Sequence, residues 1–241
     1  RMLNTFLFLV LLLFSFVANA NFMIYPISKD VHEGGSDIIR VYSKSAETQY
    51  IKIYTKKIIN PGSQNEQEVD SSNWKEGLVV SPVKLILPAG SSKSVRLTQI
   101  KKIDYEEVYR IYFESVSPQK KEHEGNIKKL NTELSVNIIY AALIRVLPEN
   151  KKMSANASIN TNGNIIVNNT GNVRIGIKNI YFCKGEEINN ECTAKEYNKN
   201  IYPGNTLDTM IANKRYRHIF LKINNSESTQ KQGENIHLRI P

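Results

Sequence analysis

The feature that most constrains this chain is a series of short apolar runs, rich in Ile, Val and Tyr, that alternate with turn-forming residues. β-Branched and aromatic residues favour strands, while Gly, Pro and Asn between them favour turns. No segment shows the period of an amphipathic helix of any length. Runs at a spacing of roughly 10–15 residues, with turn signals between them, are typical of an immunoglobulin-like β-sandwich. The first seven runs cover residues 22–27, 37–42, 50–59, 78–87, 94–100, 108–116 and 133–146.

A second set of runs follows a polar connection at residues 147–152, which reads Leu-Pro-Glu-Asn-Lys-Lys. A central strand cannot continue through its proline, and polar stretches of this kind commonly separate domains. We therefore predict an all-β chain with two tandem immunoglobulin-like sandwiches, at residues 21–147 and 148–241. The second set of runs covers residues 155–159, 165–168, 174–182, 206–211, 218–223 and 236–240.

The first twenty residues do not look like part of a sandwich. A basic start is followed by an apolar stretch of about 12 residues and by small residues in the pattern Ala18-Asn19-Ala20, which is typical of a secretory signal peptide. The alternative is an N-terminal membrane anchor, but a spanning helix needs about 20 apolar residues. We expect residues 1–20 to be removed on export, and no stable membrane insertion afterwards.

Export bears on the two cysteines, Cys183 and Cys192. They flank the segment 184–191, which has the composition of a turn. In an oxidising compartment the expected state is a disulfide across a hairpin. The alternative, a redox-active pair, usually requires the spacing Cys-x-x-Cys, which this sequence lacks.

Composition argues against several classes of function. The net charge of +9 invites nucleic-acid binding, but the lysines are spread along the chain and no aromatic–basic motif accompanies them. The four histidines are scattered, with neither a His-Glu-x-x-His motif nor a nucleophile elbow. We therefore expect no enzymatic activity, no metal, no cofactor and no nucleic-acid partner.

The long run at residues 133–146 alternates with period two. One face presents Leu134, Val136, Ile138 and Tyr140, while the other begins with polar residues and then becomes apolar. Such a pattern fits a core strand with one solvated face. It also fits a strand whose apolar row is exposed and offered to a partner. Periodicity alone leaves both interpretations open.

Arg145 lies in the otherwise apolar end of this run, at the junction between the two predicted domains. A guanidinium there needs a carboxylate or another acceptor, because an unpaired buried charge is costly. The acceptor could be an Asp or Glu of the same chain. It could also be a carboxylate from outside, which the fork of an arginine binds well.

Several segments resemble the periplasmic pilus-assembly chaperones of the PapD-like type. Residues 81–90 (SPVKLILPAG) lead into 93–97 (KSVRL), like a proline-rich block of that family that ends in KSxVRL. Residues 109–118 (YRIYFESVSP), 143–148 (LIRVLP) and 168–173 (NNTGNV) resemble three further family segments. The closest likeness, through residues 21–29 and 133–146, is to the chaperones of CFA/I-like (class 5) colonisation-factor fimbriae.

This resemblance implies a fold of two sandwiches at an angle, with a cleft between them, and a function in donor-strand complementation. A pilus subunit lacks its last strand, and the chaperone lends its own long strand to fill the groove. By resemblance the donor side chains are Leu134, Val136, Ile138 and Tyr140. The implied partners are major and minor fimbrial subunits and the outer-membrane usher, in the periplasm. The alternative is a secreted two-domain adhesin or a structural pilus subunit.

The resemblance also implies an anchor for the carboxylate at the end of the bound subunit. Lys29 matches one basic position of the family, and Arg145 is the remaining basic candidate on the donor strand, where most members carry a lysine slightly earlier. Thr132 is a further candidate for this anchor, although it could simply be an edge-strand threonine. Arg96 and Glu106 stand where the family has a buried ion pair between the domains, with two exposed charges as the alternative.

Overall fold

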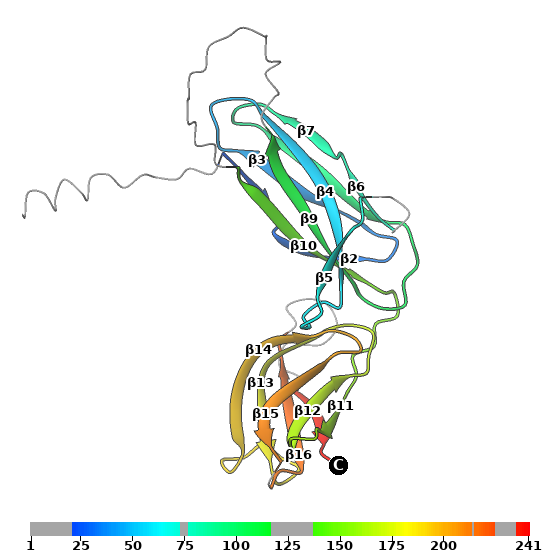
Figure 1. Cartoon of the computed structure of the whole chain (residues 1–241), viewed down its shortest axis with the longest axis vertical. Coiled ribbons are helices and arrows are strands. Elements are labelled where there is room, and N and C mark those ends of the chain that lie inside the picture. The colour runs from blue at the N-terminus through cyan, green and yellow to red at the C-terminus, as the bar shows by residue number, and fades with distance from the viewer. Residues whose placement is uncertain (1–20, 73–76, 117–136, 214, 225–234) are drawn as a thin grey trace, which may run out of the picture.

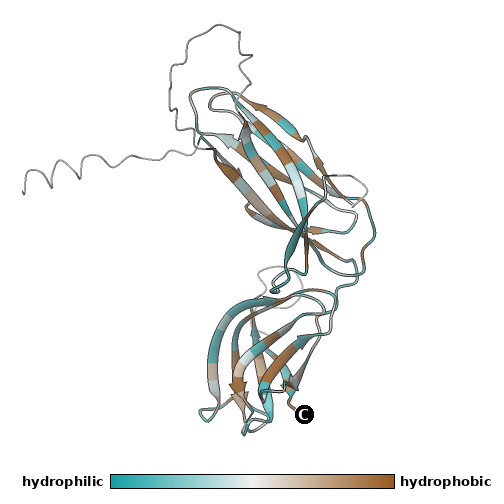
Figure 2. Ribbon diagram, in the orientation of Figure 1, coloured by the Kyte–Doolittle hydropathy of each residue, from teal (hydrophilic) through white to brown (hydrophobic). Residues whose placement is uncertain are grey.

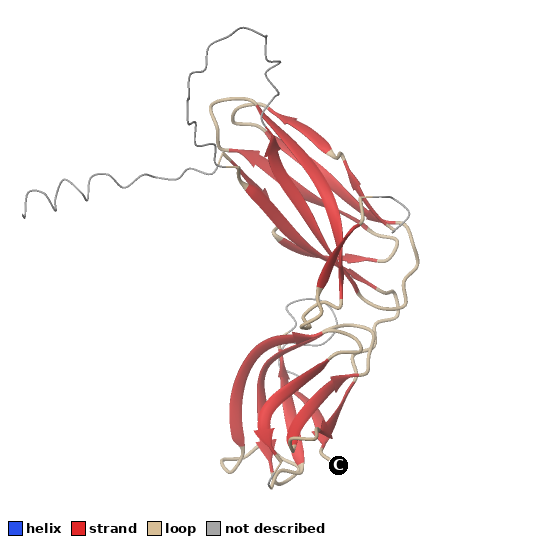
Figure 3. Cartoon of the chain, in the orientation of Figure 1, coloured by secondary structure: helices blue, strands red, loops and turns tan. Residues whose placement is uncertain are grey.

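A computed structural model describes residues 21–72, 77–116, 137–213, 215–224 and 235–241. Every regular element in these ranges is a β-strand (Figure 3). The strands form two elongated lobes that follow one another along the long axis of the molecule (Figure 1). The described part of the chain contains no helix with the length and apolar character needed to span a membrane. The fold is therefore all-β, as the sequence predicts.

The first lobe contains two facing sheets. One has the strand order β1-β3-β8-β6, and the other has the order β2-β10-β9-β4-β5, with β7 also paired to β4. Apolar side chains from both sheets fill the space between them, including Ile39, Phe113 and Ile144, which are fully buried. The strands are β1 (Phe22–Tyr25), β2 (Ser28–His32), β3 (Ser36–Ser43), β4 (Gln49–Ile59), β5 (Gln67–Asp70), β6 (Leu78–Ser81), β7 (Lys84–Leu87), β8 (Ser92–Gln99), β9 (Glu107–Val116) and β10 (Ile139–Leu147).

The second lobe is a smaller pair of sheets with the orders β11-β12-β15 and β14-β13-β16-β17. Its core is separate from that of the first lobe and includes Ile165, Phe182 and Leu221. In both lobes apolar and polar positions alternate along the strands (Figure 2), as expected when one face of each sheet is buried. The strands are β11 (Ala155–Ile159), β12 (Asn164–Asn169), β13 (Ile175–Cys183), β14 (Thr193–Ile201), β15 (Thr206–Ala212), β16 (His218–Ile223) and β17 (Asn235–Arg239).

The predicted disulfide is present. Cys183 at the end of β13 is bonded to Cys192, immediately before β14, and their Cα atoms are 4.5 Å apart. The two strands run antiparallel, so the bond closes the hairpin between them. The prediction of a disulfide-bonded hairpin is confirmed.

The N-terminal segment crosses from one sheet of the first lobe to the other. β1 pairs antiparallel with β3, whereas β2, three residues further on, pairs parallel with β10. The parallel pairing begins at Ser28 opposite Leu143 and ends at His32 opposite Leu147. β10 therefore lies between β2 and β9 only over its second half.

Hydrogen bonds join the two lobes at the junction between them. The amide of Glu106 donates to the carbonyl of Asn172 at 2.9 Å, and the Asn172 side chain donates back to the carbonyl of Asp104 at 3.0 Å. On the other side of the junction, the Asn205 side chain donates to the carbonyl of Pro61 at 2.9 Å. The lobes are thus held together by directional bonds as well as by packing.

Candidate functional site

The first half of β10 has an open backbone edge. The amide of Leu143 donates to the carbonyl of Ile27, so the backbone of Leu143 points toward β2. Backbone groups alternate in direction along a strand, so those of Ile139 and Ala141 point to the same side. Within the described residues, no strand pairs with this side of β10 before Leu143. An edge of this kind is a template on which another polypeptide can add a strand.

The side chains of β10 divide between the two faces of the sheet. Ala142, Ile144 and Val146 are buried in the core of the first lobe. Tyr140 continues this inward row, is partly buried, and packs edge-on against the ring of Phe22 with the ring centroids 5.0 Å apart. The predicted open ridge therefore does not extend to Tyr140, because this side chain belongs to the chain's own core.

Other predicted donor positions have different outcomes. Ile138 is half-buried, and Ile139, on the opposite face, is 47% exposed. Leu134, Val136 and Thr132 lie outside the described residues, so their roles stay predictions. The described residues of β10 before Tyr140 therefore lie beyond the core of the first lobe.

Arg145 has a carboxylate partner in its own chain. It lies directly opposite Asp30 of β2, and its Nε is 2.6 Å from Asp30 Oδ1. The side chains of Arg145 and Asp30 are only 12% and 6% exposed, so this is a buried ion pair. Of the two acceptors that the sequence left open, the internal one is present.

Lys29 points away from Arg145. It lies opposite Ile144, which is buried in the core, and its Nζ is 3.1 Å from Asp37 Oδ2 on β3, a strand of the facing sheet. Arg145 instead shares the outer face of the sheet with Asp30. The strand register therefore does not bring the two predicted anchor cations to one point.

The predicted ion pair between Arg96 and Glu106 is wrong. Arg96 lies on β8 and is exposed, and its guanidinium donates to Ser36 Oγ at 3.2 Å. Glu106 pairs instead with Arg174 of the second lobe, whose amide donates to Glu106 Oε2 at 2.5 Å and whose Nε is 3.7 Å from Oε1. Glu106 immediately precedes β9 and faces the second lobe, whereas Arg96 belongs to the other sheet of the first lobe.

Glu106 and the arginines form a buried charged cluster between the lobes. Burial raises the pKa of the Glu106 carboxyl above its ordinary value, while the hydrogen bond from the Arg174 amide and the charges of Arg174 and Arg145 oppose the rise. Burial also raises the pKa of Tyr202, and the nearby charge of Glu106 adds to that effect. Asp30, Arg145, Glu106 and Arg174 thus act on one another across the junction.

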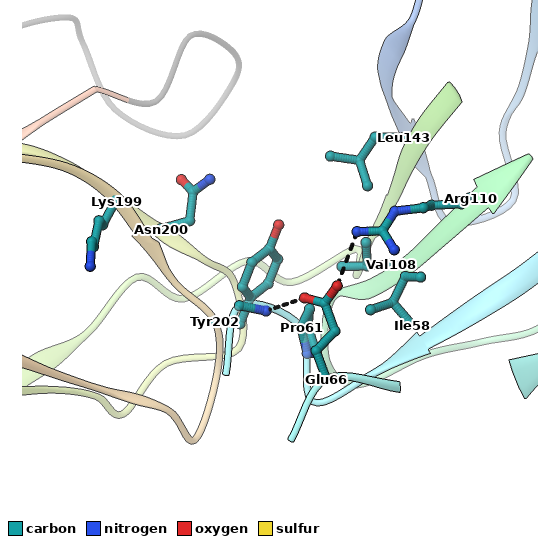
Figure 4. Close-up of a pocket in the computed structure, with 10 residues that line it drawn as sticks. Ile58, Pro61, Glu66, Val108, Arg110, Leu143, Lys199, Asn200 and Tyr202 are labelled. Atoms are coloured by element: carbon teal, nitrogen blue, oxygen red, sulfur yellow. Dashed lines mark hydrogen bonds and ion pairs between the residues drawn. The ribbon is translucent and has the colours of Figure 1, made fainter. Parts of the chain in front are cut away.

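Cavities open between the described residues of the two lobes, and two of them adjoin β10 through Leu143 and Arg145. The first has a volume of about 340 Å³ and an apolar floor made by Ile58, Val108, Leu143 and Tyr202 (Figure 4). At its rim, an ion pair joins Arg110 Nη2 to Glu66 Oε1 at 3.0 Å. The second cavity has a volume of about 290 Å³ and a polar lining, made by Ser28, Arg145, Arg174, Gly176, Ile177, Asn198, Lys199, Asn200 and Asn224.

The second lobe lines these cavities with side chains that the sequence did not identify, among them Arg174, Lys199 and Tyr202. Arg174 directly follows the segment 168–173 that carries part of the family likeness, and this position was a usable signal. Lys199 lies on a polar strand, and nothing in the sequence distinguishes it from other lysines. The described residues hold no group of three or more His, Cys, Asp or Glu side chains that could bind a metal.

Comparison with known proteins gives consistent results. No family model matches the chain. One relative, an Escherichia coli protein named as a fimbrial subunit of CFA/I, is 58% identical over 236 residues, which are 98% of this chain and 98% of that protein. The crystal structure of the class 5 fimbriae chaperone CfaA is 56% identical, covers 90% of this chain and 99% of that chain, and has a TM-score of 0.81. A chain in a chaperone–tip adhesin complex of CFA/I fimbriae biogenesis is 55% identical, covers 91% of this chain and 99% of that chain, and has a TM-score of 0.79.

Proposed function

This chain belongs to the family of class 5 fimbrial chaperones, and we propose that it binds, folds and caps fimbrial subunits by lending them its strand β10. The observation that carries the proposal is the open edge of this strand before Leu143, next to a cleft between two lobes. A subunit that lacks its last strand presents a complementary backbone edge and an apolar groove. When the edge of β10 pairs with the edge of the subunit, the unpaired backbone N–H and C=O groups of both strands form hydrogen bonds.

The side chains for this groove come from the inward row of β10 where that row continues beyond the lobe's own core. Tyr140, Ala142 and Ile144 face the core of the first lobe, and Ile138 continues their row by the period of a strand. In our proposal Leu134 and Val136 extend the row beyond the lobe into the subunit, whose core then joins that of the chaperone. Each apolar side chain removed from water contributes about 1.5–3 kcal/mol.

Arg145 anchors the bound subunit in this proposal, at the end of the same strand. Its Nε is held by Asp30, and no side chain among the described residues bonds the terminal nitrogens of its guanidinium, which can bind a second carboxylate. We place this function in the periplasm, with residues 1–20 as the export signal and the outer-membrane usher as the acceptor of the loaded chaperone. The function involves no covalent step, so we expect no enzymatic activity.

The second candidate function is that of a structural pilus component or an adhesin. One observation favours it, because the Escherichia coli relative carries the name of a fimbrial subunit. A pilin-like subunit, however, would usually have one incomplete sandwich and a detachable N-terminal donor segment. Here each of two lobes buries a core of its own. Pilins also polymerise or aggregate when purified alone, whereas a chaperone stays soluble and forms 1:1 complexes.

The test is co-expression with subunits of class 5 fimbriae, followed by affinity capture and size measurement. Wild-type chain should yield a soluble 1:1 complex, and Ile138→Asp should reduce the yield of this complex at least tenfold, because a charge then enters an apolar groove. Ile139→Asp is the matched control, since its side chain lies on the opposite, exposed face. Equal losses in the two variants, or polymers of the chain alone, would contradict the proposal.

A further inference from the structure

Two histidines that are distant in the sequence meet in the second lobe. His218 begins β16 and His237 lies on β17, and the antiparallel pairing of these strands brings the two side chains together across a sequence separation of 19. Their neighbours Ile219, Leu221 and Leu238 belong to the core. Because successive side chains of a strand point to opposite faces, both histidines lie on the outer face of the sheet.

The two imidazole rings present nitrogen atoms to each other. His218 Nδ1 is 2.9 Å from His237 Nε2. Imidazole nitrogens bind a metal ion at about 2.0–2.1 Å, so two of them at a right angle around one ion stand roughly 2.8–3.0 Å apart. The separation in this pair therefore equals that of two adjacent ligands of one metal ion. A rotation of the exposed His237 ring directs both lone pairs at the same point.

The surrounding residues hold both rings in place. His218 is only 7% exposed, and it lies opposite Cys183, which is bonded to Cys192. The His237 ring stacks on the ring of Phe220, the residue opposite it, with the centroids 4.5 Å apart and the planes 8° from parallel. Side chains that are already ordered lose little conformational entropy when they bind a ligand.

The chemistry of the pair selects the kind of metal. Neutral imidazole suits Zn(II), Ni(II) and Cu(II), and Cu(II) binds most tightly in this series. No third His, Cys, Asp or Glu joins the pair among the residues that the structure describes, so water completes the coordination. The histidine that donates the present hydrogen bond changes its tautomer on binding, so its proton moves to its other ring nitrogen and no proton is lost.

We infer that His218 and His237 form a two-histidine site for a divalent metal of the late first row, with Cu(II) bound most tightly. The ion fastens β17, the last strand of the sheet, to β16. This inference goes beyond the proposed function, because the pair lies far from β10. His218 stands at one end of β16, whereas Asn224, just past the other end, lines a junction cavity. The C-terminus lies at the end of the second lobe away from the first (Figure 1).

The test is a calorimetric titration of the mature chain, without a histidine tag, with CuCl₂ at pH 7.5. We expect one Cu(II) per chain, with an electron paramagnetic resonance spectrum that shows two imidazole nitrogens. His237→Phe removes one ligand and keeps an aromatic ring to stack on Phe220, and it should weaken binding at least tenfold. His32→Gln is the matched control, since His32 is an exposed histidine of the first lobe. Equal binding by wild type and His237→Phe, or a loss in the His32 control, would overturn the inference.

Two further measurements locate the ion. Arg239 lies opposite His218 and is exposed, so its positive charge opposes a nearby metal ion. Arg239→Gln should therefore tighten Cu(II) binding about threefold at low salt, and weaker binding would place the ion elsewhere. A ligand that binds the folded state raises stability, so Cu(II) should raise the urea midpoint of wild type above its value in EDTA. The same rise in His237→Phe would refute the assignment to this pair.

Discussion

The buried pair between Asp30 and Arg145 makes the obvious anchor mutation a stability mutation as well. Arg145→Ala leaves the Asp30 carboxylate, 6% exposed, without its partner. Removing one member of a buried ion pair costs about 3–5 kcal/mol, against a total stability of roughly 5–15 kcal/mol for a typical domain. Taking the lower figure and roughly 4 °C per kcal/mol for a lobe of this size, we expect the melting temperature to fall by roughly 10 °C.

A double variant separates stability from binding. Asp30→Asn together with Arg145→Gln replaces both charges with neutral side chains that can still hydrogen-bond. Replacing a buried pair by neutral residues is often close to neutral for stability. We therefore expect the double variant to recover most of the lost stability, to within about 1 kcal/mol of wild type. Its capture of the fimbrial partner should nevertheless stay at least 30-fold below wild type, because a bound carboxylate has lost its partner at a cost of about 2–5 kcal/mol.

Urea unfolding followed by circular dichroism measures the change in stability. Capture of the fimbrial subunit at equal chaperone concentration measures the change in binding. Asp30→Asn alone is the control for the pair, since it leaves the Arg145 charge in the cleft. If Arg145→Ala is as stable as wild type, Asp30 is not a buried partner in solution. If the double variant shows normal capture, Arg145 is not the anchor.

Two further perturbations test the junction and the second lobe. Because burial raises the pKa of Glu106 above its usual 4.5, the folded chain holds this proton more tightly than the unfolded chain, and the free energy of unfolding falls as pH rises just above 4.5. Glu106→Gln removes this titration, so the urea midpoint of the variant should vary less than that of wild type between about pH 4.5 and 7. An equal dependence of the two midpoints on pH would contradict the assignment of this titration to Glu106. Replacing Cys183 and Cys192 with alanine opens a loop with a sequence separation of 9. We expect a loss of about 2–3 kcal/mol in urea unfolding, and stability equal to that of the oxidised wild type would refute this estimate.

The sequence predicted the interior strands well, and the strands that it missed share one physical property. β2, β5 and β14 all lie at the end of a sheet. An edge strand is paired on one side only and tolerates charged and polar residues, so its apolar pattern is weak. β5 is exposed at every position, and β14 is mostly exposed. Hydrophobic periodicity cannot detect such strands, because their pairing comes from a neighbour distant in sequence.

The site was predictable to the extent that it depends on local chemistry. The need of Arg145 for an acidic partner followed from its apolar surroundings alone, and Asp30 supplies that partner. The direction in which the Lys29 side chain points depends instead on long-range geometry, and so does the identity of the residue that pairs with Glu106. The chain changes sheets between β1 and β2, and the resulting register turns Lys29 toward the facing sheet. Arg174 reaches Glu106 only because the two lobes dock.

In the proposed function, the anchor and the donor positions belong to one strand, β10. Between Ile138 and Arg145 the strand advances about 3.3 Å per residue, so the two functions stand at a fixed separation of roughly 23 Å. A shift of one residue in an added strand would turn every one of its side chains to the opposite face. Under the proposed function, a carboxylate held in the cleft at Arg145 would therefore fix the register of the partner along the open edge. In this proposal the buried charges at the junction contribute specificity of alignment, and the apolar row contributes the affinity.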